Sequence, residues 1–174
     1  YQEIQDSYIV LATNSTLFSE ERLEILKPLV NRLQISLDTL SKEKFIQIRG
    51  VDLLGITLEK IKLTKKMGFD IQIAFSLFEE NLNEIEDIVK FCYCNNIDKI
   101  NVLRQRPTGR SRSNLSPQKI KEAYKRFLFL AKDKKIKIII HDPIANVLGV
   151  GGECSAAKES IAIDIHGGFK PCPL

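Results

Sequence analysis

The sequence has few of the residues that mark several protein classes. Its 174 residues include no tryptophan, one methionine, two histidines and four cysteines. No apolar run approaches the roughly 18 residues that a membrane-spanning helix needs. We therefore expect no membrane helix. Hydrophobic residues make up 44% of the chain, which excludes a disordered or fibrous protein and favours one globular domain with, at most, a small appendage.

The charge balance is mildly basic and does not by itself indicate nucleic acid. Lysine and arginine number 26 against 22 acidic residues, a net charge of +4. Residues 104–112 contain four arginines, which could bind an anion or a substrate carboxylate or could form an ordinary exposed basic loop. Aromatic residues do not alternate with these arginines, so RNA or DNA binding is not favoured.

The first residues bear on where the protein is located in the cell and on whether the sequence is part of a larger protein. The first residue is Tyr1 rather than methionine, and residues 1–6 form neither the basic nor the apolar region of a secretory signal. We expect a cytoplasmic protein whose cysteines are thiols or metal ligands rather than disulfides. We also expect this chain to be part of a larger protein.

Strand-like and helix-like segments alternate along the chain. Apolar runs rich in isoleucine and valine predict strands at 8–13, 33–37, 70–75, 99–103 and 136–140. Helical spacing and capping residues predict helices at 19–33, 52–67, 81–95 and 116–133. This repeat predicts an α/β fold with a mainly parallel open sheet, or part of a (βα) barrel. The nearly continuous apolar runs suggest strands buried on both faces.

The last part of the chain has a different composition. Glycine and proline become frequent after residue 142, and the run at 160–165 is followed by Gly167 and Gly168. This pattern predicts a small β-hairpin. We therefore divide the chain into a sheet domain, residues 1–142, and an extension, residues 143–174.

Ligands of parallel α/β proteins bind at the carboxyl ends of the strands. Polar residues stand at the ends of the predicted strands, among them Asn14, Ser36, Asp38 and Arg104. The others are Thr13, Ser76, Arg106, His141 and Asp142. The topology predicts that they meet at one rim of the sheet. Asn14 and Asp38 could equally serve to cap or turn the chain.

The four cysteines fall into two groups, for which we expect different roles. Cys92 falls on the apolar stripe of a predicted helix and Cys94 points away from it, which is typical of ordinary core and surface cysteines. The predicted hairpin would return Cys172 toward Cys154. Two thiolates supply half of a tetrahedral site for zinc or an iron–sulfur cluster, and the alternative is two free thiols in a loop.

The order of several motifs resembles radical S-adenosylmethionine (SAM) enzymes that carry a SPASM or twitch extension. Residues 9–14 resemble the third barrel strand, ending in Thr-Asn, and residues 33–38 with 48–50 resemble the fourth, with its Ser-Leu-Asp and Arg-Gly. Residues 81–85 resemble the Asn-Leu-x-Glu helix start, and residues 101–110 resemble the sixth strand and its Pro-x-Gly loop. Cys154, Gly167 and Cys172 satisfy the Cys-x12-Gly-x4-Cys of a SPASM domain.

The resemblance implies a partial barrel and an iron–sulfur oxidoreductase that generates a 5′-deoxyadenosyl radical from SAM, for peptide or protein modification. It implies that Ser36 helps bind SAM, that Asn14, Asp38 and Arg104 line the same cavity, and that Cys154 and Cys172 are ligands of an auxiliary [4Fe–4S] cluster. The Cys-x3-Cys-x2-Cys that holds the catalytic [4Fe–4S] cluster is absent from the 174 residues. We therefore expect this chain alone to be inactive.

That absence leaves another class of function open. The chain could be a non-catalytic α/β module that binds a partner or an anion through its arginine-rich loop. In either case the first strand of the sheet would lack a neighbour. Because exposed strand edges pair with other chains, we expect a possible homodimer through this edge.

Overall fold

The computed structural model describes residues 8–105, 115–140, 142–150, 161–163 and 166–171. Five strands form one parallel sheet in the order β1-β2-β3-β4-β5. The strands are β1 (Val10–Thr13), β2 (Arg32–Ser36), β3 (Ile71–Leu77), β4 (Lys99–Arg104) and β5 (Lys137–Ile139). The predicted α/β fold with a parallel partial barrel is confirmed.

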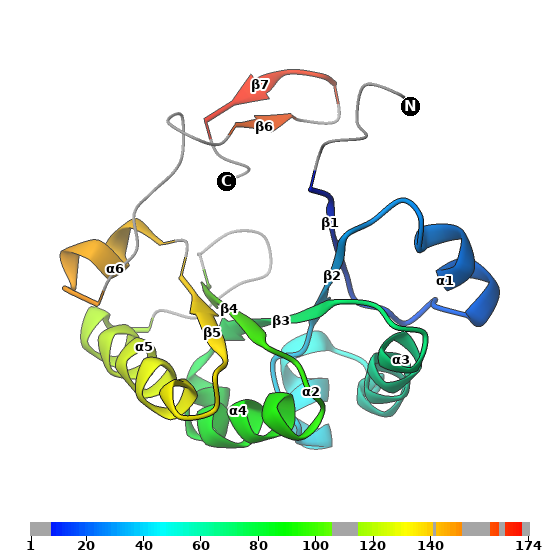
Figure 1. Ribbon diagram of the computed structural model, residues 1–174. Helices are drawn as coiled ribbons and strands as arrows, with labels where there is room; N and C mark the ends of the chain where they lie inside the picture. The colour runs from blue at the N-terminus through cyan, green and yellow to red at the C-terminus, as the bar shows by residue number, and fades with distance from the viewer. Residues whose placement is uncertain (1–7, 106–114, 141, 151–160, 164–165, 172–174) are drawn as a thin grey trace.

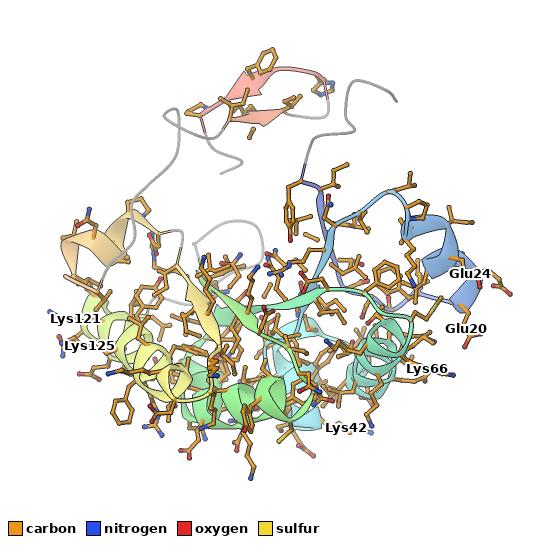
Figure 2. All side chains as sticks on the ribbon, in the orientation of Figure 1. Glu20, Glu24, Lys42, Lys66, Lys121 and Lys125 are labelled. Atoms are coloured by element: carbon orange, nitrogen blue, oxygen red, sulfur yellow. The ribbon has the colours of Figure 1, made fainter. Side chains whose placement is uncertain are left out.

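The helices connect successive strands and cover one side of the sheet (Figure 1). Because each strand is hydrogen-bonded to the next strand in the chain, the sheet curves as part of a barrel with the helices outside. The helical elements are α1 (Glu20–Leu26), α2 (Lys42–Arg49), α3 (Leu54–Lys66), the 3-10 helix η2 (Glu79–Glu84), α4 (Ile85–Cys94), α5 (Pro117–Lys132) and α6 (Pro143–Val147). Figure 2 shows Lys42, Lys66, Lys121 and Lys125 on this outer, helical side.

The core lies between the sheet and these helices. Leu33, Ile35, Ile73 and Phe75 are fully buried. Phe75 of β3 meets Phe127 of α5 in an edge-to-face contact with ring centroids 5.3 Å apart. Such pairs add about 0.5–1.5 kcal/mol to the stabilisation from burial alone.

The helix expected at 19–33 ends much earlier than predicted. Ser19 caps α1 as expected, with its hydroxyl accepting from the Arg22 N–H. Pro28 has no N–H to continue the helical ladder, so α1 ends at Leu26. Two further helices, α2 and α6, were not predicted from the sequence.

The end of the described chain forms the expected hairpin. Strands β6 (Ala162–Ile163) and β7 (Phe169–Lys170) pair antiparallel, and Gly167 takes a φ of 81° in the connecting turn. Asp142 caps α6, and Ala145 is fully buried against the sheet domain. The division between residues 142 and 143 stays a prediction. In the described ranges, no helix is long and apolar enough to cross a membrane.

Candidate functional site

The two faces of the sheet differ in chemistry. Apart from Arg104 at the end of β4, the residues that face the helices are apolar, whereas those that alternate with them in β2, β3 and β4 are mostly small or polar, with Leu103 as an exception. Register pairs Gln34 with Gln72 and Ser36 with Ala74, and Ala74 in turn pairs with Asn101. The described helices cover only one face (Figure 1), yet the expected burial on both faces is met in β3, where Gln72 and Ala74 on the opposite face are 8% and 3% exposed. We call this opposite face the polar face.

Ser36 lies on the polar face at the carboxyl end of β2. Its neighbour in β3 is Ala74, whose small side chain leaves room beside the hydroxyl. Ser36 is half-buried, and within the described residues its hydroxyl has no hydrogen-bond partner. A partly exposed hydroxyl at the carboxyl end of a parallel strand can contact a ligand.

Asp38, two residues further on, is part of the fold rather than an open site. Its side chain is 1% exposed, its Oδ1 accepts from the Ser76 N–H at 2.8 Å, and its Oδ2 pairs with Arg49 at the end of α2. Burial raises the pKa of Asp38, and the Arg49 charge opposes that rise. The carboxylate therefore joins β2, β3 and α2.

Asn81 reinforces the same junction from η2. Its side-chain N–H groups donate to the carbonyls of Asp38 and Ser76 at 2.7 and 2.8 Å. Its Oδ1 accepts from the Phe78 N–H at 2.9 Å, and Asn81 is fully buried. One amide thus fixes the spacing between the carboxyl ends of β2 and β3.

Glu84, three residues later, holds the loop that follows Asp38. Its Oε2 accepts from the Thr39 hydroxyl at 2.7 Å and from the Leu40 N–H at 2.8 Å. Lys44 lies 2.7 Å from the other oxygen. Burial alone would raise the pKa of Glu84, but these partners hold it below the ordinary value. The sequence analysis noted Asn81 and Glu84 as a motif without assigning them to the site.

Asn14 lies in a turn after β1. Its Oδ1 accepts from the Thr16 N–H at 3.3 Å and from the Thr16 hydroxyl at 3.1 Å, which is the pattern of an Asx turn. The side chain is exposed, and its remaining N–H groups stay available to a ligand at the rim.

Arg104 occupies a different place from Ser36. It is paired in register with Leu77, so it shares the helical side of the sheet with Val102 rather than the polar face. Its Nε donates to Asp142 at 2.6 Å, and the Tyr124 hydroxyl donates to the same carboxylate at 3.1 Å. Burial would raise the pKa of Asp142, but Arg104 and the other donors hold it below the ordinary value. The hydrogen bond from Arg104 to Asp142 raises the pKa of the guanidinium.

A cluster of amides, which the sequence analysis missed, lies deeper on the polar face. Gln72 donates to the Gln34 Oε1 at 2.6 Å, and Asn101 donates to the same oxygen at 3.0 Å. We call Gln34, Gln72 and Asn101 the amide row, because they come from β2, β3 and β4 side by side. The available signal was alternation: each amide interrupts an otherwise apolar strand at a position that faces away from the helices.

The described residues do not fit an iron–sulfur cluster. No group of three or more His, Cys, Asp or Glu residues within them could hold a metal. Cys92 is fully buried, which raises its pKa to about 12, and Cys94 is exposed. Cys154 and Cys172 lie outside the described residues.

The comparisons with known proteins decide the family. A model of the radical SAM superfamily matches residues 1–92, more than half of the chain. The chain belongs to the radical SAM superfamily. The parallel sheet and its rim are therefore those of a radical SAM protein.

Curated relatives fall into two groups. The antilisterial bacteriocin subtilosin biosynthesis protein AlbA of Bacillus subtilis is 27% identical over 185 residues, covering 95% of this chain and 38% of AlbA. A probable GTP 3′,8-cyclase of Sulfurisphaera tokodaii is 25% identical over 127 residues, covering 72% of this chain and 41% of that protein. The chain therefore spans about two fifths of the length of these relatives.

Solved structures share the fold. Streptococcus suis SuiB bound to the precursor peptide SuiA superposes with a TM-score of 0.77 at 16% identity, over 94% of this chain and 42% of SuiB. Native anSMEcpe with bound AdoMet gives a TM-score of 0.70 at 16% identity, over 95% of this chain and 50% of that one. These likenesses extend beyond the residues that the family model matches.

Proposed function

We propose that this chain is the part of a radical SAM enzyme that helps bind SAM and its substrate, and that the substrate is a peptide. The main support is the extent of the matches. AlbA aligns with 95% of the chain, whereas the relatives named GTP 3′,8-cyclase align with 52–72%. The tail of the chain thus has a counterpart in the bacteriocin biosynthesis protein.

Within this proposal, Ser36 is the SAM-contacting residue of the chain. Its hydroxyl lies on the polar face at the carboxyl end of β2, where ligands of parallel α/β proteins bind. Asn14 is the second candidate, through its free N–H groups at the same rim. Asp38 and Arg104 are positioning residues, because their charges are already paired with Arg49 and Asp142. SAM, once bound, supplies the 5′-deoxyadenosyl radical of this superfamily.

We also propose that Cys154 and Cys172 contribute two ligands to an auxiliary [4Fe–4S] cluster. The support is the hairpin β6–β7, whose turn reverses the chain between them. Two thiolates cannot complete a tetrahedral set. The purified chain should therefore carry substoichiometric, labile iron or zinc. Metal analysis should show this metal lost in Cys154→Ser, and unchanged metal content would contradict the auxiliary site.

To test the proposed SAM chemistry, the experiment uses the longest protein product that contains this 174-residue chain. After anaerobic reconstitution with iron and sulfide, it is incubated with SAM and dithionite, and 5′-deoxyadenosine is measured by mass spectrometry. We expect 5′-deoxyadenosine to form, with KM for SAM raised about tenfold in Ser36→Ala through the loss of one hydrogen bond. Ser19→Ala is the matched control, because that hydroxyl already caps α1.

Two outcomes would change the proposal. If no 5′-deoxyadenosine forms, the chain belongs to a non-catalytic module, the alternative that the missing cysteine motif leaves open. GTP added to the reaction tests the second candidate, GTP cyclisation, which the Sulfurisphaera tokodaii relative favours. Conversion of GTP to a cyclised product would replace a peptide by a nucleotide as the substrate.

A further inference from the structure

The amide row joins three neighbouring strands on the polar face, with Gln34 and Gln72 paired in register and Asn101 one step nearer the carboxyl ends. The Gln34 Oε1 accepts from Gln72 at 2.6 Å and from Asn101 at 3.0 Å. Gln72 and Asn101 are each 8% exposed, and Gln34 is half-buried. A core face of an α/β sheet is normally apolar, so three linked amides at this depth need an explanation beyond packing.

The row is incompletely satisfied. Among the described residues, the buried Asn101 Oδ1 has no hydrogen-bond partner, and neither has the buried Gln105 Oε1 just beyond β4. Gln105 directly follows Arg104, the last residue of β4, four positions after Asn101, and continued alternation of the chain puts both on the same face. A buried acceptor without a donor destabilises the protein by its lost hydration. Two such acceptors on one face indicate that donors from outside the described structure reach them.

The charge of the polar face restricts which chemical groups can donate hydrogen bonds to the acceptors of Asn101 and Gln105. From Gln34 in β2, Gln72 in β3 and Asn101 in β4 up to the strand ends, the described residues on the polar face carry no charge. Toward the strand starts the same face carries Arg32, which is buried and paired with Asp70, and Lys99 and Lys137 at the first positions of β4 and β5, away from the carboxyl-end rim. A triphosphate needs arginine or lysine partners. A neutral group with N–H donors suits the uncharged part of the polar face better.

We propose that the amide row, together with Gln105, is a hydrogen-bonding subsite for a peptide segment of the substrate. A peptide group offers an N–H to the orphaned acceptors of Asn101 and Gln105, and a carbonyl to the amide N–H groups of the row. Asn101 in β4 and Gln105 just after it flank Leu103, so a segment lying here meets polar, apolar and polar side chains in turn. This inference rests on the proposed peptide substrate.

The test measures binding of a neutral peptide, acetyl-triglycine-amide, to the chain by NMR. The signals are the side-chain amide resonances of Gln34 and Gln72, titrated up to about 10 mM peptide, since a few net hydrogen bonds give millimolar affinity. We expect saturable shifts that require about tenfold more peptide in Asn101→Leu, which keeps the side-chain size but removes the acceptor. Gln118→Leu, on the exposed side of α5, is the matched control and should bind as the wild type does.

Several results would overturn the proposal. Absent shifts, or shifts unchanged in Asn101→Leu, would mean that the orphaned acceptors are filled by buried water alone. Shifts produced by GTP and not by the peptide would assign the row to a nucleotide. If Asn101→Leu fails to fold, Gln105→Leu, just after β4, replaces it with the same expectation. If the peptide does not bind but SAM cleavage still depends on Ser36, only this subsite is refuted. If SAM is not cleaved, the proposed function itself is refuted.

Discussion

Replacing Asn81 by alanine should destabilise the protein far more than replacing its neighbour Asn83. The Asn81 side chain makes three buried hydrogen bonds, to the Asp38 and Ser76 carbonyls and from the Phe78 N–H. Alanine leaves all three backbone groups without a partner in the interior. At roughly 1 kcal/mol each, the free energy of unfolding should fall by about 3 kcal/mol.

The assay is equilibrium unfolding in urea followed by circular dichroism. With an m-value of about 2 kcal/mol/M, the midpoint should fall by roughly 1.5 M. Asn83→Ala is the control, because Asn83 is exposed in the same helical turn and accepts only from Lys44. A loss below about 1 kcal/mol for Asn81→Ala, or an equal loss in the control, would refute the assignment of Asn81 as the link between β2 and β3.

Three further predictions follow from the described contacts. The folded-state pKa of Asp142 lies below its ordinary value, so its ionised form stabilises the fold at neutral pH and the contribution is lost as pH falls through the folded-state pKa. Asp142→Asn should therefore lower stability at pH 7 by about 2 kcal/mol and flatten the acid limb of the unfolding curve, and an unchanged acid limb would contradict the pairing with Arg104. Alkylation at pH 8, mapped by mass spectrometry, should label Cys94 in the folded protein and Cys92 only after unfolding, and rapid labelling of Cys92 would contradict its burial. Because β1 is an exposed sheet edge, light scattering should give the mass of a dimer for the wild type and of a monomer for Val10→Lys. A wild-type protein that is monomeric at high concentration would contradict the predicted dimer.

Most of the fold was predictable from local sequence. The apolar runs of β2, β3 and β4 were visible because each is bounded by polar or turn residues. Helix α5 was visible from Ser116 and Pro117 at its start. Helix α2 was missed because its residues are mostly polar and only Phe45 is buried. Local pattern predicts an element when that element supplies much of the core.

The candidate site was predictable only in part. Parallel topology alone indicates that Ser36 lies at the rim, since carboxyl ends of parallel strands share one edge. The pairing of Arg104 with Asp142 joins residues 38 positions apart, and Asn81 reaches Asp38 across 43 positions. Such partners depend on how helices pack on the sheet, which periodicity does not encode. Sequence spacing therefore located the rim but not the partners of its charged residues.

The central claim is that this chain forms part of a SAM site through Ser36. The most direct test is SAM binding to the 174-residue chain itself, observed through ligand NMR, for the wild type, Ser36→Ala and Ser19→Ala. We predict weak binding, with Kd of about 1 mM or above because few contacts remain without the catalytic cluster, and further weakening only in Ser36→Ala. Micromolar binding that Ser36→Ala leaves unchanged would contradict this prediction.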